Sequence, residues 1–305
     1  MDQLIIEACL NGSRPRSENP NIPCTPDEVL AEARRCADAG ASIVHVHART
    51  AEGGISYDAN WYAEVAERIA SETDLILNVT TTRFGGVPRE QIFDYLRRCA
   101  GRLEMIALNC GAIVLNRKQA DGHRRHLEIP NSWDDLLATL AVCRDLHITP
   151  EPATFDVGFL STLVALVADG AMEQPRYMLL EFANRLGDGI QAIPGTPAAY
   201  AFMSDLVRSA LPGTIWAAHG GPETCFLIAG LAISTGAHAR LGFEDRVALP
   251  DGQLARSNAE LVAWGVESAR LYGRRPATPA ETRQLIGLHR DKAAPLAHRA
   301  DARKA

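Results

Sequence analysis

The chain has 305 residues, of which 47% are hydrophobic, 22% charged and 6% aromatic, the balance of a globular protein. Its formal charge of −6 argues against a nucleic-acid-binding protein, because such domains usually carry a basic face. No apolar stretch approaches the roughly 18 residues that cross a bilayer, and the first residues lack a signal-peptide pattern, so we expect a cytoplasmic protein without a membrane partner.

Apolar runs typical of strands alternate with amphipathic segments typical of helices along the whole chain. The expected strands are Leu4–Cys9, Ser42–Ala48, Leu75–Thr80, Met105–Asn109, Ile148–Phe155, Tyr177–Phe182, Thr214–His219 and Ala237–Gly242. The expected helices are Thr25–Ala39, Ala59–Ser71, Pro88–Ala100, Ser132–Leu146, Val157–Ala168, Thr196–Ala210, Pro222–Thr235 and Gly252–Tyr272, with a short last helix beginning at Thr278. Eight strand–helix pairs without a linker predict one α/β domain over residues 1–288, a (β/α)₈ TIM barrel. A doubly wound sheet split into two domains is the alternative.

Two polar segments fall outside this pattern. The basic stretch from Arg117 to Arg125, which includes His123 and is followed by His126, comes after the fourth strand. We expect a solvated loop there; a cover over the site or a phosphate contact is the alternative. Residues 289–305 are rich in Ala, Arg and Lys, and we expect this tail either to be disordered or to dock on a neighbouring subunit.

The seven cysteines stand at positions 9, 24, 36, 99, 110, 143 and 225. Their number is odd, and no pair has the CxxC spacing of a zinc knuckle or of a disulfide framework. They therefore indicate a reducing compartment.

The second expected strand contains His45 and His47, separated by one residue. Because side chains alternate along a strand, both imidazoles point to the same face of a rigid element. A single histidine in an apolar strand is usually a core residue, whereas two at this spacing can supply the first two ligands of a divalent metal.

The eighth expected strand carries Arg240 and is followed by Glu244 and Asp245. Active sites of such barrels lie at the carboxyl ends of the strands, and a closed barrel brings strand eight close to strand two. Glu244 is therefore a suitable third metal ligand, although an acidic pair in a solvated loop is the plainer interpretation of these residues taken alone.

Other strand ends supply hydroxyl and amide groups. These are Thr80 and Thr81 after the third strand, Asn109 at the end of the fourth, and Asn11 after the first. Each is weak evidence alone, since Thr and Asn are common in loops.

Two further residues are left open. Glu7 is a carboxylate inside an apolar strand, and it either supports a metal-bound histidine or faces the helices outside the barrel. His219 ends the seventh strand before Gly220 and Gly221 and is a second-tier candidate.

Together these motifs resemble the β-keto acid cleavage enzymes, whose founding member is the 3-keto-5-aminohexanoate cleavage enzyme. The resemblance runs in the same order along nearly the whole chain. It rests on Asn11-Gly12, Asn19-Pro20-Asn21-Ile22-Pro23, the run from Ala39 to Arg49, Gly242-Phe243-Glu244-Asp245, the run from Gly252 to Val262 and Ala277-Thr278-Pro279.

The resemblance implies a zinc-dependent (β/α)₈ barrel that condenses a β-keto acid with acetyl-CoA, giving acetoacetate and a new acyl-CoA. It implies one zinc ion per subunit, held by His45, His47 and Glu244. It further implies that Asp245 and Arg240 form the catalytic pair and that the family's serine after strand three falls on Thr80. Thr81, Asn109 and Asn11 would bind substrate. The resemblance also suggests a homo-oligomer, such as a tetramer.

Two positions depart from the founding enzyme, which carries carboxylates where this chain has Arg14 and Ala153. Those carboxylates suit an amino-bearing substrate. We therefore expect a β-keto acid with a neutral or anionic tail that Arg14 binds. The alternative is that Arg14 only lines the rim of the barrel.

A metal-dependent hydrolase is the main alternative enzyme class, because paired histidines on a barrel strand are also the first metal ligands in the active sites of such hydrolases. A metal-binding barrel without catalysis is the non-enzymatic alternative, and the intact group of Arg240, Glu244 and Asp245 argues against it.

Overall fold

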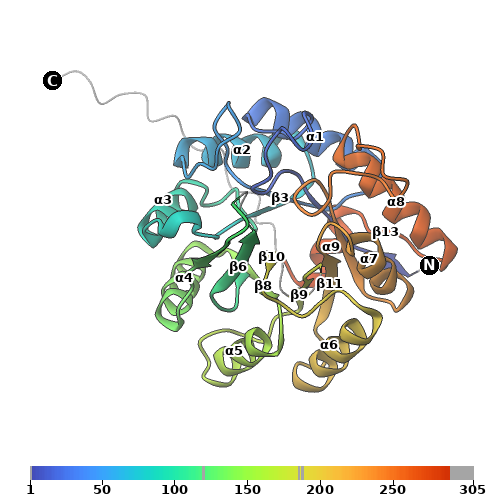
Figure 1. The fold of residues 1–305 in the computed structure, drawn as a ribbon. Coiled ribbons are helices and arrows are strands. Elements are labelled where there is room, and N and C mark those ends of the chain that lie inside the picture. Colours follow the sequence, from blue (N-terminus) through green and yellow to red (C-terminus); the bar gives the residue numbers. More distant parts are fainter. Residues whose placement is uncertain (1, 119–120, 185, 187–188, 289–305) are drawn as a thin grey trace.

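Eight parallel strands close into a barrel in the computed structural model, which describes residues 2–118, 121–184, 186 and 189–288. In barrel order the strands are β2 (Ile6–Cys9), β3 (Ile43–Val46), β4 (Ile76–Val79), β5 (Met105–Asn109), β8 (Thr149–Thr154), β9 (Tyr177–Phe182), β11 (Ile215–Gly220) and β12 (His238–Leu241). Strand β12 pairs with β2 and completes the ring. Figure 1 shows the strands surrounded by helices. The predicted (β/α)₈ barrel is confirmed.

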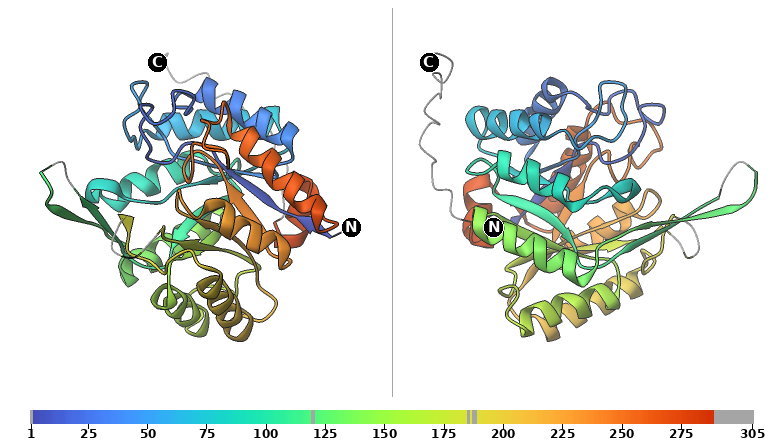
Figure 2. Two further views of the ribbon diagram at one scale, coloured as in Figure 1. Left: turned by 45° about the vertical axis from the view of Figure 1, so that its right-hand side comes forward. Right: turned by 90° about the vertical axis from the view of Figure 1, so that its left-hand side faces the viewer.

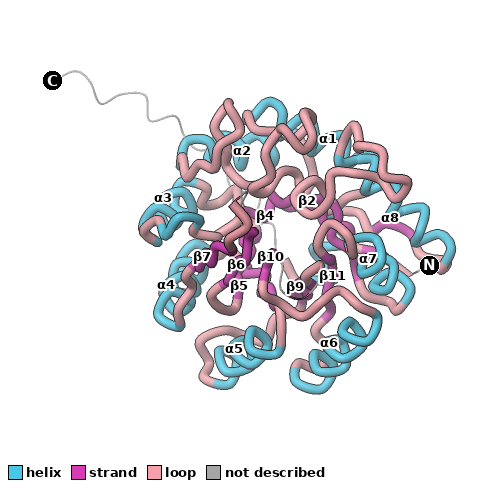
Figure 3. The backbone as a smooth tube through the Cα atoms, viewed as in Figure 1, coloured by secondary structure: helices cyan, strands magenta, loops and turns pink. Residues whose placement is uncertain are grey.

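Eight helices alternate with the barrel strands and cover their outer faces, as Figure 3 shows. They are α1 (Pro26–Ala39), α2 (Ala59–Glu72), α3 (Arg89–Arg98), α4 (Trp133–Leu146), α5 (Val157–Ala168), α6 (Pro197–Ala210), α7 (Cys225–Ser234) and α8 (Asn258–Leu271), and a 3₁₀ turn spans Phe84–Gly86. Helix α8 begins six residues later than predicted. The residues before it form an antiparallel bridge between Ala248 and Leu254, and the Ser257 side chain caps the helix.

The amino-terminal end of the barrel is closed by the last helix, α9 (Pro279–Ile286). Strand β1 (Gln3–Leu4) pairs with β13 (Arg275–Pro276) beside it. Ile286 and Leu288 join Ile5 and Ile43 in one buried apolar cluster. At the opposite end, where the strands finish, the loops carry polar side chains.

The basic segment after β5 is a β-hairpin, not the solvated loop that we expected from the sequence. Strand β6 (Ile113–Lys118) pairs antiparallel with β7 (Arg124–Ile129), and β10 (Gly189–Ile190) extends the small sheet. Figure 2 shows this hairpin reaching beyond the other elements, away from α9. Its base is anchored because Ile113 and Ile129 are buried with Phe155.

All seven cysteines are buried and free. Within the described residues, no helix combines the length and apolar character needed to cross a membrane. The tail over residues 289–305 lies outside the described residues.

Candidate metal centre and active site

His45, in β3, and His47, directly after it, lie at the carboxyl end of the barrel. His45 and His47 are 2% and 4% exposed, and their ring centroids are 5.1 Å apart. Burial lowers the pKa of His45 well below its usual value, so its imidazole stays neutral, as a metal ligand must be.

Glu244, in the loop after β12, faces both imidazoles. Its Oε1 lies 3.3 Å from His47 Nε2, and its Oε2 lies 3.5 Å from His45 Nε2. Two ligands of a tetrahedral zinc ion, each bonded at about 2.05 Å, are separated by about 3.3 Å. Glu244 Oε2 is buried and has no hydrogen-bond partner among the described residues. The donor set and this unpartnered oxygen therefore fit a divalent cation.

The charge state of Glu244 also suits a ligand. Burial alone would raise the pKa of this carboxyl, but the Arg240 guanidinium and the two imidazoles hold it well below its usual range. Nη2 of Arg240 lies 3.0 Å from Glu244 Oε1.

The loop that carries Glu244 is held against the loop after β2. Arg14 donates Nε to the carbonyl oxygen of Glu244 at 2.8 Å and Nη2 to that of Asp245 at 2.9 Å. Gly12 has a φ of +55°, and a Cβ there would overlap the Glu244 side chain. A Cβ at Gly242 would overlap the carbonyl of Cys9. The close approach of these loops therefore requires glycine at both positions.

Asn11 is fully buried behind His47 rather than exposed to the mouth of the barrel. Its Nδ2 donates to the carbonyl oxygens of His47 and Pro23, and its Oδ1 accepts from the His47 N–H. Direct substrate contact, which we expected from the sequence, does not fit this position because the amide is engaged with backbone groups. Asn11 instead holds the end of β3.

Asp245 is 5% exposed and is contacted from three strands. Its Oδ2 accepts from the Cys9 thiol at 2.9 Å and from Arg240 Nε at 3.3 Å, and its Oδ1 lies 3.2 Å from His219 Nδ1. The structure therefore brings Arg240, Glu244 and Asp245 together beside the two histidines. His219, a second-tier candidate from the sequence, lies in direct contact with Asp245.

The hydroxyl and amide candidates line the β4 and β5 side of the mouth. The Thr80 hydroxyl oxygen accepts from the Thr82 N–H at 3.0 Å, so its own O–H remains available to donate. Thr81 donates to the carbonyl of Ala107 at 2.6 Å, and Asn109 Nδ2 donates to the Thr82 hydroxyl at 3.2 Å.

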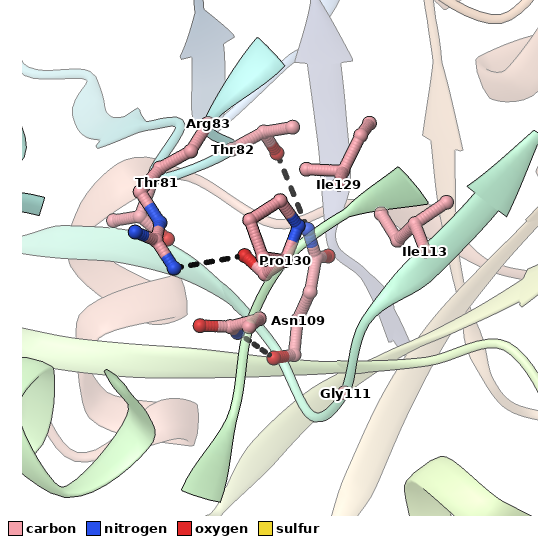
Figure 4. Close-up of a pocket in the computed structure, with 9 residues that line it drawn as sticks. Thr81, Thr82, Arg83, Asn109, Gly111, Ile113, Ile129 and Pro130 are labelled. Atoms are coloured by element: carbon pink, nitrogen blue, oxygen red, sulfur yellow. Dashed lines mark hydrogen bonds between the residues drawn. The ribbon is translucent and has the colours of Figure 1, made fainter. Parts of the chain in front are cut away.

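Thr81, Thr82 and Asn109 also line a small cavity at the base of the hairpin, which Figure 4 shows with Arg83 and Pro130. Its volume of about 10 Å³ is the space of a single water molecule.

Beneath His45, His47 and Glu244, the barrel interior contains two carboxyl groups that are completely buried. Asn78 Nδ2 donates to Glu7 Oε1 at 3.1 Å and to Glu151 Oε2 at 2.6 Å. Burial raises the pKa of both carboxyls, and the charge of Glu7 raises that of Glu151 further. Glu7 Oε1 lies 4.0 Å from His45 Nδ1, so Glu7 faces inward, beside the histidine.

Three further polar residues of the barrel interior are not among the candidates expected from the sequence: Glu151, Asn78 and Glu181. Asn78 and Glu181 are polar residues within strands that are otherwise apolar, which is the signal that singled out Glu7, whereas the strand of Glu151 also contains two threonines.

Comparisons with known proteins agree with this geometry. A family model described as beta-keto acid cleavage enzyme matches residues 3–288. The 3-keto-5-aminohexanoate cleavage enzyme of Acetoanaerobium sticklandii is 30% identical over 290 residues, which cover 94% of this chain and 99% of that protein. The 3-oxoadipate:acetyl-CoA acetyltransferase of Cupriavidus necator is 29% identical over 286 residues, covering 93% of this chain and 94% of that protein.

Among solved structures, the apo structure of ObcA aligns with a TM-score of 0.70 at 18% identity. The alignment covers 88% of this chain and 66% of that one. Similarity at this identity supports the barrel fold alone.

Proposed function

Since this chain belongs to the beta-keto acid cleavage enzyme family, we propose that it transfers an acyl group between a β-keto acid and acetyl-CoA, releasing acetoacetate. The observation that carries the proposal is the convergence of His45, His47 and Glu244, whose ligand atoms lie within 4.8 Å of one another. We propose zinc as the ion that they hold. Two imidazoles and one carboxylate leave a coordination position for substrate, as in catalytic zinc sites.

A zinc ion held there would act as a Lewis acid on the keto and carboxylate oxygens of the substrate. Asp245 would remove a proton from the carbon between these groups, acting as the general base. Arg240 contacts both Asp245 and Glu244, and thus orients the base relative to the metal ligand.

The substrate carbanion would then attack the thioester carbonyl of acetyl-CoA, whose oxygen gains negative charge. The hydroxyl oxygen of Thr80 accepts a hydrogen bond from the Thr82 N–H, so its own O–H can still donate. This O–H is a suitable donor to the thioester oxygen. The thioester C–S bond would break and release CoA thiolate, which would attack the former keto carbon. Cleavage of the bond between that carbon and C2, with a proton returned to C2, would give the new acyl-CoA and acetoacetate. Thr81 and Asn109, on the same side of the mouth, would contact the substrate.

We further propose a substrate tail that is neutral or anionic. Ala153 lies in the apolar cluster of the barrel interior with Leu179 and Ala217, so it offers no charge to an ammonium group. Arg14 places a guanidinium on the rim, where the founding enzyme has a carboxylate. Its side chain is 20% exposed, and part of its charge is balanced by Glu18 at 2.5 Å.

A panel of β-keto acids with neutral, anionic and amino-bearing tails, assayed with acetyl-CoA for acetoacetate, tests the proposal. We expect turnover that requires acetyl-CoA and is slowest with the amino-bearing acid. Turnover in the absence of acetyl-CoA would contradict acyl transfer and favour the metal-dependent hydrolase. Faster turnover of the amino-bearing acid would contradict only the proposed tail.

We also propose that residues 1–288 form one catalytic domain of a cytoplasmic homo-oligomer. Both the cellular location and the oligomer stay predictions from the sequence.

A further inference from the structure

Asp245 is the near end of a row of contacting side chains that continues through His219 to a second carboxylate. His219, at the end of β11, lies between Asp245 and Glu181, with Nδ1 3.2 Å from Asp245 Oδ1 and Nε2 3.0 Å from Glu181 Oε2. His219 and Glu181 are directly paired in the register of β11 with β9, so both side chains face the barrel interior. The imidazole is 8% exposed.

The two carboxylates determine how the imidazole is protonated. Nε2 of His219 hydrogen-bonds with Glu181 Oε2, and Nδ1 lies 3.2 Å from Asp245 Oδ1 and 3.3 Å from the carbonyl oxygen of Gly220. Both ring nitrogens thus face acceptor oxygens, to which an N–H can donate. Burial alone would lower the pKa of His219, as does the charge of Arg240, but Asp245 and Glu181 together raise it above the usual value. The raised pKa favours the form of His219 that carries a proton on both ring nitrogens.

The contact with His219 restrains an oxygen that is otherwise held weakly. Asp245 Oδ2 receives the Cys9 thiol and Arg240 Nε, whereas Oδ1 has Arg240 Nη2 only at 3.5 Å, longer than an ordinary hydrogen bond. His219 supplies the closer partner for Oδ1. Without it, Oδ1 would keep only the long contact to Arg240 Nη2, and the orientation of the carboxylate would depend mainly on the contacts to Oδ2.

We propose that His219 is a positioning residue for Asp245 and that Glu181 fixes the orientation of His219. The inference rests on the proposed function, since it assigns Asp245 as the base. It follows the general arrangement in which a third group orients the partner of the reacting residue. His219 acts on the rate of proton removal and has no part in holding the metal or the thioester.

Four variants test the inference: His219→Ala, His219→Asn, Glu181→Gln and the control His126→Ala, which changes an exposed histidine of the hairpin. The Asn side chain places an N–H donor near the position of Nδ1 but cannot reach Glu181. Three readouts apply to each variant. They are steady-state kinetics, zinc content, and the enzyme-catalysed exchange of the substrate C2 protons with D₂O in the absence of acetyl-CoA.

We expect His219→Ala to lower kcat and C2 exchange about 100-fold, with KM for acetyl-CoA and zinc content unchanged. His219→Asn should recover at least a tenth of the wild-type rates, and Glu181→Gln should lose less than His219→Ala. The control should match the wild type.

Exchange in His219→Ala within twofold of the wild type would overturn the inference. So would equal rates in His219→Asn and His219→Ala, or loss of zinc from His219→Ala. Wild-type turnover is measured first and decides the proposed function separately: an enzyme that converts no β-keto acid would remove both claims. If the wild type converts a β-keto acid but C2 exchange is unaffected in His219→Ala, only the role of His219 is contradicted.

Discussion

The side-chain amide of Asn11 forms two hydrogen bonds with the backbone of His47, 36 positions further along the chain. Nδ2 donates to the His47 carbonyl oxygen and Oδ1 accepts from the His47 N–H, both at 2.9 Å. A third bond runs from Nδ2 to the carbonyl of Pro23. The loop after β2 thus fixes the backbone of a metal-ligand candidate at the point where β3 ends.

Replacing Asn11 with Ala should therefore weaken both folding and metal binding. The variant leaves three buried backbone groups without partners, which should lower the free energy of unfolding by about 3 kcal/mol. Because His47 loses its support, we expect the Kd for zinc to rise at least about tenfold. Denaturant unfolding and zinc titration measure the two effects. Asn21→Ala, at an exposed position, is the control, and equal Kd values for the two variants would contradict the role of Asn11.

Gly12→Ala should displace the third ligand. The backbone of Gly12 has a φ of +55°, which costs a non-glycine residue about 1–3 kcal/mol, and the added Cβ would also overlap Glu244. Gly122→Ala is a matched control, since its φ is +84° but no atom lies within 4 Å of the added Cβ. We expect both variants to be destabilised and only Gly12→Ala to bind zinc more weakly. Similar zinc affinity in the two variants would show that Gly12 does not set the position of Glu244.

Asp245→Asn should separate catalysis from metal binding. The amide has the same size as the carboxylate but cannot take a proton, so kcat should fall about 10³-fold. Zinc content should equal that of the wild type, because Glu244, His45 and His47 are unchanged. Metal analysis and acetoacetate formation on the same sample check both points. Retained turnover would remove Asp245 from the role of base.

His238 should make the folded state sensitive to acid. It is buried in β12, its Nδ1 accepts the Ile5 N–H at 3.0 Å, and burial lowers its pKa from 6.5 to about 3. Between these pH values the unfolded chain binds a proton that the folded chain does not, so the free energy of unfolding falls as the pH falls. His238→Asn keeps an acceptor for Ile5 but does not titrate.

Relative to His238→Asn, the wild type should therefore lose about 3 kcal/mol of stability between pH 7 and pH 4. Chemical denaturation across this range measures the difference. Parallel stability curves for the two proteins would contradict a neutral, buried His238.

The barrel and the principal side chains of the site could be predicted because their signals are local. The alternation of His45 and His47 fixes their common face, and closure of an eight-stranded barrel brings the loop with Glu244 towards them. The register of the barrel is not local, and it determines which polar residues meet. That is why the contact between His219 and Glu181 emerges only from the pairing of β11 with β9.

The sequence predicts a loop where the structure has the hairpin. The reason is that β7 is rich in charge and five of its six residues are exposed, so it lacks the apolar pattern of a buried strand. Its turn signal was nevertheless present in Asp121-Gly122, where the Asp121 side chain accepts the His123 N–H. Asn11 was misjudged for a different reason. A strand-end asparagine can face either the mouth or the backbone of the next strand, and only the packed structure distinguishes these positions.

The zinc content of dialysed protein tests the central claim most directly. We predict one zinc ion per chain in the wild type, and its loss from His45→Ala, His47→Ala and Glu244→Ala but not from His126→Ala. A wild type that retains no zinc, or variants that retain as much as the wild type, would contradict a metal centre built from these three side chains.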